Sequence, residues 1–214
     1  MKYSPLDLAL QNVVPVLAVP LHGTFEPLVN IGQRFLVGGD GLYIEVRRAW
    51  LHAVWPIAHE SRVAKPFGVV QRCVRMEFGA IPGWIKERFA SDAIASGNME
   101  IAACIVWNSF TQTLDYRRCI ALNASSHRIE YVRPSLASYE SLVLDLHSHG
   151  HGRAFFSATD NEDDRNEVKI AGVVGNVNGE LSWKFRLCLA GIFINESDKH
   201  SQQYDLCHGD VSNA

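Results

Sequence analysis

The sequence lacks the features that mark membrane and nucleic-acid-binding proteins. No apolar run approaches the roughly 20 residues of a membrane-spanning helix. Pro5 and Asp7 interrupt the first residues, so no signal-peptide pattern is present. The formal net charge is only −3, which excludes a strongly basic surface for nucleic acid or anionic lipid. We therefore expect a globular, cytoplasmic protein that binds neither nucleic acid nor membrane.

The cysteines lack the spacing of a structural zinc site. Five are present, at positions 73, 104, 119, 188 and 207, and no two form a Cys-x-x-Cys pair. Cys104, Cys119 and Cys188 lie in apolar, strand-like segments, where a free cysteine behaves as a small hydrophobe. We interpret them as buried thiols in a reducing compartment.

One short segment carries the strongest chemical signal. The triplet His147-Ser148-His149 is followed after seven residues by Ser157, and two residues separate Ser157 from Asp160. The apolar run 141–146 predicts a buried strand that ends at the histidines. Residues at i and i+2 of a strand face the same side, so both imidazoles can reach one ion. Because catalytic zinc typically has three protein ligands and a water, the pattern predicts one zinc ion per chain, bound by His147, His149 and Asp160.

This spacing resembles the JAMM (MPN+, JAB domain) family of zinc metallopeptidases, whose pattern is Glu…His-Ser/Thr-His-x7-Ser-x2-Asp. Four positions of the pattern are matched, by His147, His149, Ser157 and Asp160. The resemblance covers about residues 81–194. Gly150 and Phe156 depart from it, because proline is frequent at both positions in the family. Gly150 therefore predicts a more flexible loop after the histidines. Within the family, the chain looks most like protein A of the bacterial PRTRC system.

The resemblance implies a role for each residue of the site. Glu100, at the start of the apolar segment 99–107, fits the family's upstream glutamate and would act as general base toward the metal-bound water. Ser157 would donate a hydrogen bond to the oxyanion. The implied reaction is cleavage after the C-terminal glycine of a ubiquitin-like protein. Ubiquitin-like and E1-like (ThiF-related) proteins are encoded with the PRTRC relatives, so both are expected partners.

The implied fold class is α+β. Residues 79–195 are expected to form a JAB/MPN-like (cytidine-deaminase-like) mixed sheet flanked by helices. A β-rich extension over residues 1–78 would precede it, and a polar tail over 196–214 would follow. In the extension, residues 35–37 and 42–46 on either side of a Gly-Gly-Asp-Gly turn predict a hairpin. The alternating segment Trp50–Trp55 predicts a strand that ends at Pro56.

The pattern of residues 79–195 also predicts individual elements. A helix begins at Ile81, with Pro82 in its first turn, and stops at Gly97-Asn98. Its buried face is expected to carry the apolar residues 81, 84, 85 and 89. Further elements are strands near 100–107, 113–122, 127–133 and 141–147, an acidic helix over 161–167, and a hairpin of 168–174 with 181–189. The polar segment 124–139 is a candidate contact for the ubiquitin-like substrate.

Each candidate residue has a structural alternative. His147 and His149 could be strand-end histidines satisfied by hydrogen bonds. Ser157 and Asp160 could form the capping box of the acidic helix, which leaves Asp160 able to bind metal. Glu100 could be an ordinary carboxylate at a strand edge. His151 offers a shifted register that places Thr159 and Glu162 at the serine and aspartate positions; that register fits less well, and we interpret His151 as a loop residue.

Two other functions compete with the peptidase. A non-catalytic scaffold for ubiquitin-like proteins would keep the fold and the metal, but it has no need for an open coordination position. A zinc nucleobase deaminase would carry His-x-Glu and Pro-Cys-x-x-Cys motifs. Neither motif occurs in this sequence, so the deaminase is the weaker alternative.

Overall fold

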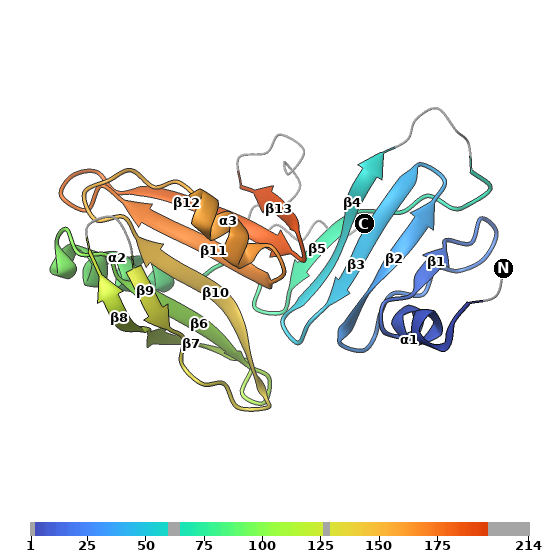
Figure 1. Ribbon diagram of the computed structural model, residues 1–214, viewed down its shortest axis with the longest axis horizontal. Helices are drawn as coiled ribbons and strands as arrows, with labels where there is room; N and C mark the ends of the chain where they lie inside the picture. Colours follow the sequence, from blue (N-terminus) through green and yellow to red (C-terminus); the bar gives the residue numbers. More distant parts are fainter. Residues whose placement is uncertain (1–2, 60–64, 126–128, 197–214) are drawn as a thin grey trace. The chain divides into compact units, whose positions relative to one another are not determined.

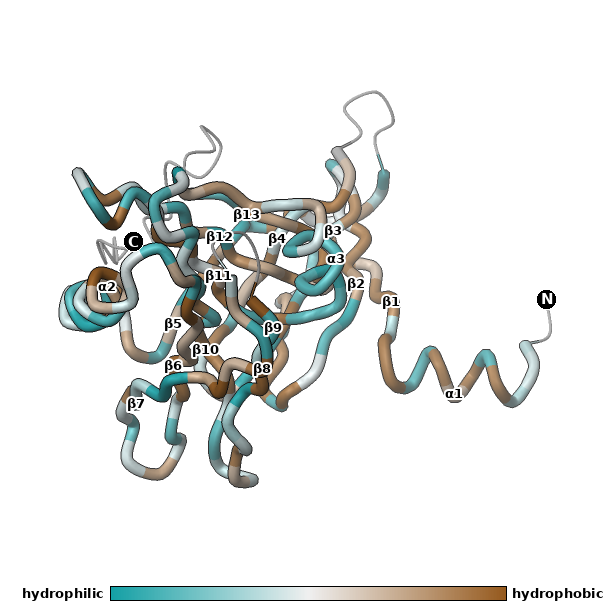
Figure 2. Tube along the Cα trace, turned by 60° about the vertical axis from the view of Figure 1, so that its left-hand side comes forward, coloured by the Kyte–Doolittle hydropathy of each residue, from teal (hydrophilic) through white to brown (hydrophobic). Residues whose placement is uncertain are grey.

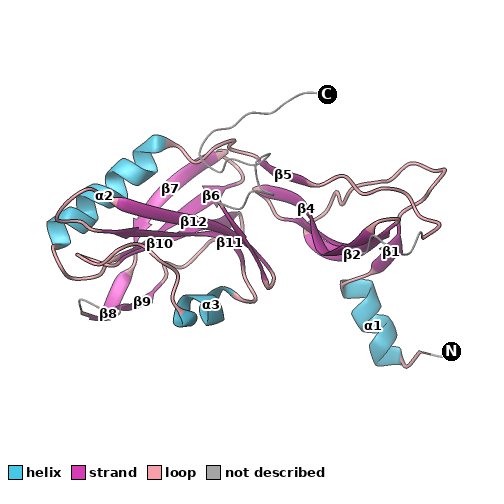
Figure 3. Cartoon of the chain, turned by 90° about the horizontal axis from the view of Figure 1, so that it is seen from above, coloured by secondary structure: helices cyan, strands magenta, loops and turns pink. Residues whose placement is uncertain are grey.

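The computed structural model describes residues 3–59, 65–125 and 129–196. The chain divides into two compact units, Met1–Glu77 and Phe78–Ala214, each built on a β-sheet of its own (Figure 1). Strands predominate, and the described residues contain three helices, so the α+β class is confirmed (Figure 3). Among these helices, none has the length and apolar character needed to cross a membrane.

A five-stranded sheet forms the N-terminal unit, in the order β1-β2-β3-β4-β5. Its strands are β1 (Val16–Ala18), β2 (Gly32–Gly38), β3 (Gly41–Arg47), β4 (Leu51–His59) and β5 (Cys73–Met76). β2 and β3 pair antiparallel across the glycine-rich turn, which confirms the predicted hairpin. A small core lies between this sheet and the flanking segments, formed by Val19, Leu36, Tyr43, Val54 and Val70.

The end of strand β4 differs from the prediction. β4 does not end at Pro56 but continues to His59. The register of β4 against β3 shifts there, because Tyr43 lies opposite Pro56 and Leu42 opposite Ala58. Such a bulge accommodates proline, which has no N–H for the ladder.

The helix α1 (Pro5–Val13) was not predicted. Ser4 caps it: the Ser4 hydroxyl accepts a hydrogen bond from the Asp7 backbone N–H at 3.1 Å, and the Asp7 carboxylate accepts one from the Ser4 N–H. Apolar and polar residues alternate along α1 (Figure 2). None of its residues is buried. The signal was nevertheless present, since Ser-Pro-x-Asp combines a capping box with proline at the first helical position.

A six-stranded mixed sheet forms the C-terminal unit, in the order β13-β12-β11-β10-β6-β7. Its strands are β6 (Ala102–Asn108), β7 (Thr113–Arg118), β10 (Glu140–Ser148), β11 (Val168–Gly175), β12 (Ser182–Leu189) and β13 (Ile192–Asn195). β10 and β11 are parallel, and the other neighbours are antiparallel. The predicted hairpin of β11 with β12 is confirmed. Of the predicted tail over 196–214, all but Glu196 lies outside the described residues.

One predicted strand is two strands in the structure. Residues 113–122 divide into β7 and β8 (Ile120–Ala124), and β8 leaves the large sheet to pair with β9 (Ile129–Val132). The chain changes partner at Cys119, whose N–H donates to the carbonyl of Ala102. No glycine or proline marks this point. The apolar alternation of Leu114 and Tyr116 stops at Arg117-Arg118 and resumes at Ile120. Residues 126–128 of the predicted third strand lie outside the described part.

The helices α2 (Gly83–Ser96) and α3 (Ala158–Asp164) lie on opposite sides of the large sheet (Figure 3). α2 buries Ile85, Phe89 and Ala93, whereas Trp84 is 43% exposed, so its predicted place on the buried face was wrong. The buried stripe follows a strict four-residue spacing, and Trp84 is about 100° around the helix from it. Pro82 is the N-cap of α2 and does not lie inside the first turn, and Gly97 ends the helix with φ of 62° as predicted.

Candidate metal centre

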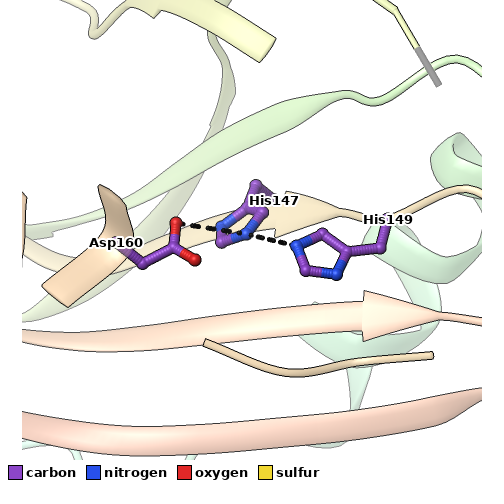
Figure 4. A group of neighbouring side chains, drawn as sticks. All are labelled: His147, His149 and Asp160. Atoms are coloured by element: carbon purple, nitrogen blue, oxygen red, sulfur yellow. Dashed lines mark hydrogen bonds and ion pairs between the residues drawn. The ribbon is translucent and has the colours of Figure 1, made fainter. Parts of the chain in front are cut away.

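β10 ends at the two predicted histidine ligands. His147 lies within the strand, opposite Ala102 of β6 and Val173 of β11. His149 follows the last strand residue, and its N–H donates to the carbonyl of Val174 at 2.8 Å. The chain therefore stays extended through both histidines, and their imidazoles come together on one side (Figure 4).

The helix α3 brings Asp160 to the same place. Ser157 is the N-cap of α3, its hydroxyl oxygen accepts from the Asp160 N–H at 3.2 Å, and its own N–H donates to Asp160 Oδ2 at 2.6 Å. The capping box considered as an alternative is therefore present. It uses Oδ2 and leaves Oδ1 facing His147, at 3.5 Å from Nε2. The Asp160 carboxylate thus completes the capping box through Oδ2, while Oδ1 lies beside His147.

The spacing of the three side chains fits a zinc ion. Their donor atoms all lie within 4.8 Å of one another, and the Nε2 atoms of His147 and His149 are 3.1 Å apart (Figure 4). Tetrahedral zinc with bonds of about 2.0–2.2 Å places any two donor atoms about 3.3–3.5 Å apart. The observed separations of 3.1 and 3.5 Å lie close to that distance. The donor types, two imidazoles and a carboxylate, are those that zinc takes.

The tautomer of His149 and the lowered pKa of His147 favour metal binding. His149 Nδ1 lies 3.2 Å from the carbonyl oxygen of Arg153, which can only accept a hydrogen bond, so we assign the proton to Nδ1. Nε2 of His149 then presents its lone pair to the cluster, as in many metal sites. Burial lowers the pKa of His147 and keeps that imidazole neutral. A neutral imidazole is the form that binds a metal ion.

Glu100 lies two residues before β6 and lines the same cavity as His147, His149 and Asp160. The cavity measures about 1000 Å³, and the Glu100 residue is only 6% exposed. Burial, and after it the charge of Asp160, raises the pKa of Glu100 to about 7. A carboxyl group with a pKa near neutrality can accept a proton and return it.

Ser148 fixes the segment that carries Glu100, a role that the sequence reasoning did not assign. Its N–H donates to the carbonyl of Ile101 at 2.9 Å, and its hydroxyl oxygen accepts from the Ile101 N–H at 2.9 Å. Ser148 is 1% exposed. Its position between the two histidines turns its side chain to the opposite face of β10, so it cannot be a third ligand there.

The raised pKa of Glu100 predicts a pH-dependent stability of the metal-free protein. The folded state favours the protonated carboxyl, so this stabilisation is complete below the ordinary pKa of about 4.3 and is lost as the pH rises through about 7. In the presence of chelator, we expect Glu100→Gln to match the wild type at pH 4 and to exceed its free energy of unfolding by about 2–3 kcal/mol at pH 8. Denaturant titrations at both pH values measure this. An equal difference at the two pH values would contradict the environment described for Glu100.

A buried network of charges lies beside the ligands, and the sequence reasoning missed it. Lys169 of β11 is 2% exposed, and its Nζ contacts three carboxylates, Asp145 and Asp164 at 2.8 Å and Glu167 at 2.6 Å. Asp145 is two residues before His147 on β10, and Asp164 ends α3. Lys169 therefore joins β10 and α3, the two elements that bring the candidate ligands together. A lysine inside the apolar run of β11 was the available signal.

The loop after the histidines explains one departure from the family pattern. Gly150 has φ of 51°, which proline cannot adopt. A Cβ atom on Gly150 would also lie 2.8 Å from the carbonyl oxygen of Asn98. The Asn98 side chain accepts from the N–H of His151 at 3.2 Å, and His151 itself is exposed, as expected of a loop residue. Contacts with Asn98 thus position this loop, and its greater flexibility stays a prediction.

Two family models match the chain. Residues 85–186 match the model described as prokaryotic homologs of the JAB domain, and residues 4–77 match a domain of unknown function, DUF2016. The first match identifies the C-terminal unit as a domain of the JAB/MPN family. This family includes metallopeptidases, and its members often bind zinc. No curated protein matches the chain.

Proposed function

We propose that the protein is a zinc-dependent peptidase of the JAMM type. It would cleave the peptide or isopeptide bond after the C-terminal glycine of a ubiquitin-like protein. The observation that carries this proposal is the cluster of His147, His149 and Asp160, with the carboxyl group of Glu100 in the same cavity. A scaffold that only binds its partner has no need for a buried acid of raised pKa beside the metal ligands.

The residues of the site have separate tasks in this reaction. Zinc, held by the three ligands, would supply a water molecule whose pKa falls from about 15.7 towards about 7. Glu100 accepts the proton of the attacking water and passes it to the leaving amine. Ser157 donates to the oxyanion; its hydroxyl now donates to Asp160 Oδ2 at 2.6 Å, so the hydrogen must rotate from Asp160 to the substrate.

The β8–β9 hairpin supports an extended peptide as the substrate. Leu122, Ile129 and Val132 line the cavity that also contains the ligands. Leu122 is 69% exposed and Val132 is 48% exposed, so apolar side chains are available beside the site. An extended glycine tail is narrow and can add to a strand edge through main-chain hydrogen bonds. The resemblance to PRTRC protein A supports a ubiquitin-like protein as the source of that tail and an E1-like protein as a further partner.

A cleavage assay tests the proposal. The substrate is a ubiquitin-like protein with a fluorogenic amide on its C-terminal glycine. We expect the zinc-loaded protein to release the fluorophore, a chelator to stop the release, and added zinc to restore it. A zinc-loaded protein that binds this substrate without cleaving it would contradict the peptidase and favour the scaffold.

Removing the Ser157 hydroxyl separates its two roles. Ser157→Ala is expected to lower the cleavage rate about 10²–10³-fold and to cost about 1 kcal/mol of stability through the lost N-cap. Ser157→Gly should lose the same activity but only a few tenths of a kcal/mol, because glycine is a tolerated N-cap. Rates and denaturant midpoints of both variants measure this. Full activity in Ser157→Gly would leave Ser157 with the capping role alone.

A further inference from the structure

We infer that Cys73, His52 and Glu45 of the N-terminal unit form a nucleophilic thiol site that accepts an acyl group. The three residues come from the neighbouring strands β5, β4 and β3. His52 Nδ1 lies 3.9 Å from Cys73 Sγ, and His52 Nε2 lies 2.9 Å from Glu45 Oε1. This is the order nucleophile, base and orienting acid that activates a thiol or hydroxyl for attack on a carbonyl.

The strand register explains why the three side chains meet. Val54 of β4 lies opposite Glu45 of β3 and opposite Cys73 of β5. His52 is two residues from Val54, so it projects from the same face of the sheet. Glu45 and Cys73 are therefore its diagonal neighbours on either side, within reach of a long side chain. No short sequence motif links the three positions, so the site follows from the sheet alone.

Glu45 is fixed as a buried, ionised carboxylate. It is 0% exposed. The Leu28 N–H donates to Oε1 at 2.8 Å, and the Arg34 Nε donates to Oε2 at 2.5 Å. Burial acts to raise the pKa of Glu45, but the hydrogen bonds from His52, Leu28 and Arg34 outweigh it and lower the pKa. A negative charge held in this way orients the ring of His52 and leaves Nδ1 directed at the sulfur.

His52 is positively charged at neutral pH. Its contact with Cys73, and after it the hydrogen bond with Glu45, raises the pKa of His52 to about 9. The imidazolium thus lies in contact with the sulfur of Cys73, with Nδ1 at 3.9 Å from Sγ. Cys73 also packs against the small core of this unit, and the contact with a charged histidine is what distinguishes it from a cysteine in purely apolar surroundings.

The position of Cys73 suits an extended acyl donor. Cys73 is only partly buried. It begins β5, which is the outermost strand of its sheet among the described residues. A chain laid along such an edge gains main-chain hydrogen bonds. The sulfur would attack as the thiolate on the carbonyl carbon of a thioester. A new S–C bond forms, the donor's C–S bond breaks, and the donor sulfur leaves as a thiol after taking the proton of His52.

Acylation of the full-length, zinc-loaded protein by a thioester of N-acetylglycine tests the inference. Mass spectrometry of the peptides gives the acylation rate at each cysteine at pH 7. We expect Cys73 to react at least about tenfold faster in the folded chain than in urea, because only the folded chain has the His52 contact. A folded-state rate at or below the rate in urea would overturn the inference, and this comparison needs no variant.

Variants then separate activation from packing. His52→Gln is expected to slow acylation of Cys73 at least about tenfold, whereas His22→Gln, at an exposed histidine of the same unit, should leave it unchanged. Cys73→Ser should abolish the adduct on that peptide. If Cys73 were acylated at the same rate in His52→Gln and in the wild type, His52 would not activate Cys73, and the three residues would only pack together. The zinc content should be the same in every variant, so this outcome is distinguishable from a failure of the peptidase proposal.

Discussion

Replacing Glu100 by glutamine is expected to lower the rate of glycine-tail cleavage by about 10²–10⁴-fold while one zinc per chain remains bound. Gln keeps the size of the side chain but cannot accept a proton from water. Zinc should remain because the donor atoms belong to His147, His149 and Asp160, and Glu100 is not among them. Steady-state rates and elemental analysis of the same preparation measure both quantities.

Glu87→Gln is the matched control, because Glu87 is an exposed glutamate of α2. It should change neither the rate nor the zinc content. If the Glu100→Gln variant were active, Glu100 would not be the general base. A variant that loses its zinc would instead show that Glu100 takes part in binding the metal.

Lys169→Met should destabilise the protein by about 3–5 kcal/mol, since it leaves uncompensated charge in the interior. Lys169 is the common partner of Asp145, Asp164 and Glu167, and the first two are buried. Repulsion between these carboxylates should also move α3 away from β10, so the affinity for zinc should fall as well. Urea unfolding and a competition titration with a chromogenic chelator measure the two effects.

Lys184→Met provides the comparison, because Lys184 is an exposed lysine of the neighbouring strand β12. Its effect should stay within about 0.5 kcal/mol. If Lys169→Met proved equally mild, the network would contribute little to the fold. If Lys169→Met were unstable but bound zinc normally, the network would not position the ligands.

The clustering of His147, His149 and Asp160 could be predicted from the sequence because its geometry is local. Two residues at i and i+2 of a strand share a face whatever the rest of the fold, and a capping box places Asp160 at the start of α3. Glu100 required more, since it reaches the site only through the pairing of β6 with β10. Glu100 was predicted from the family pattern. Its distance in sequence from the histidines would not have identified it.

The features that the sequence did not predict depend on contacts between distant segments. Lys169 is unexpected in an apolar strand, and only its contacts with Asp145 and Asp164 explain its burial. The cluster of Cys73 with His52 requires the register of β4 against β5. The exchange of sheets at Cys119 is marked by no glycine or proline, and the interruption of the apolar alternation at Arg117-Arg118 does not by itself predict a change of partner strand. In each case the structure depends on a contact with a distant segment, which the local sequence pattern does not predict.

The central claim is that His147, His149 and Asp160 bind zinc, and the zinc content per chain tests it most directly. Wild type and Asp160→Ala are purified without added metal and analysed for zinc. We predict about one zinc per chain in the wild type and much less in Asp160→Ala, which loses one of three protein ligands. A wild type that holds no zinc even after reconstitution would contradict the account, and the two histidines would then be structural residues at the end of β10.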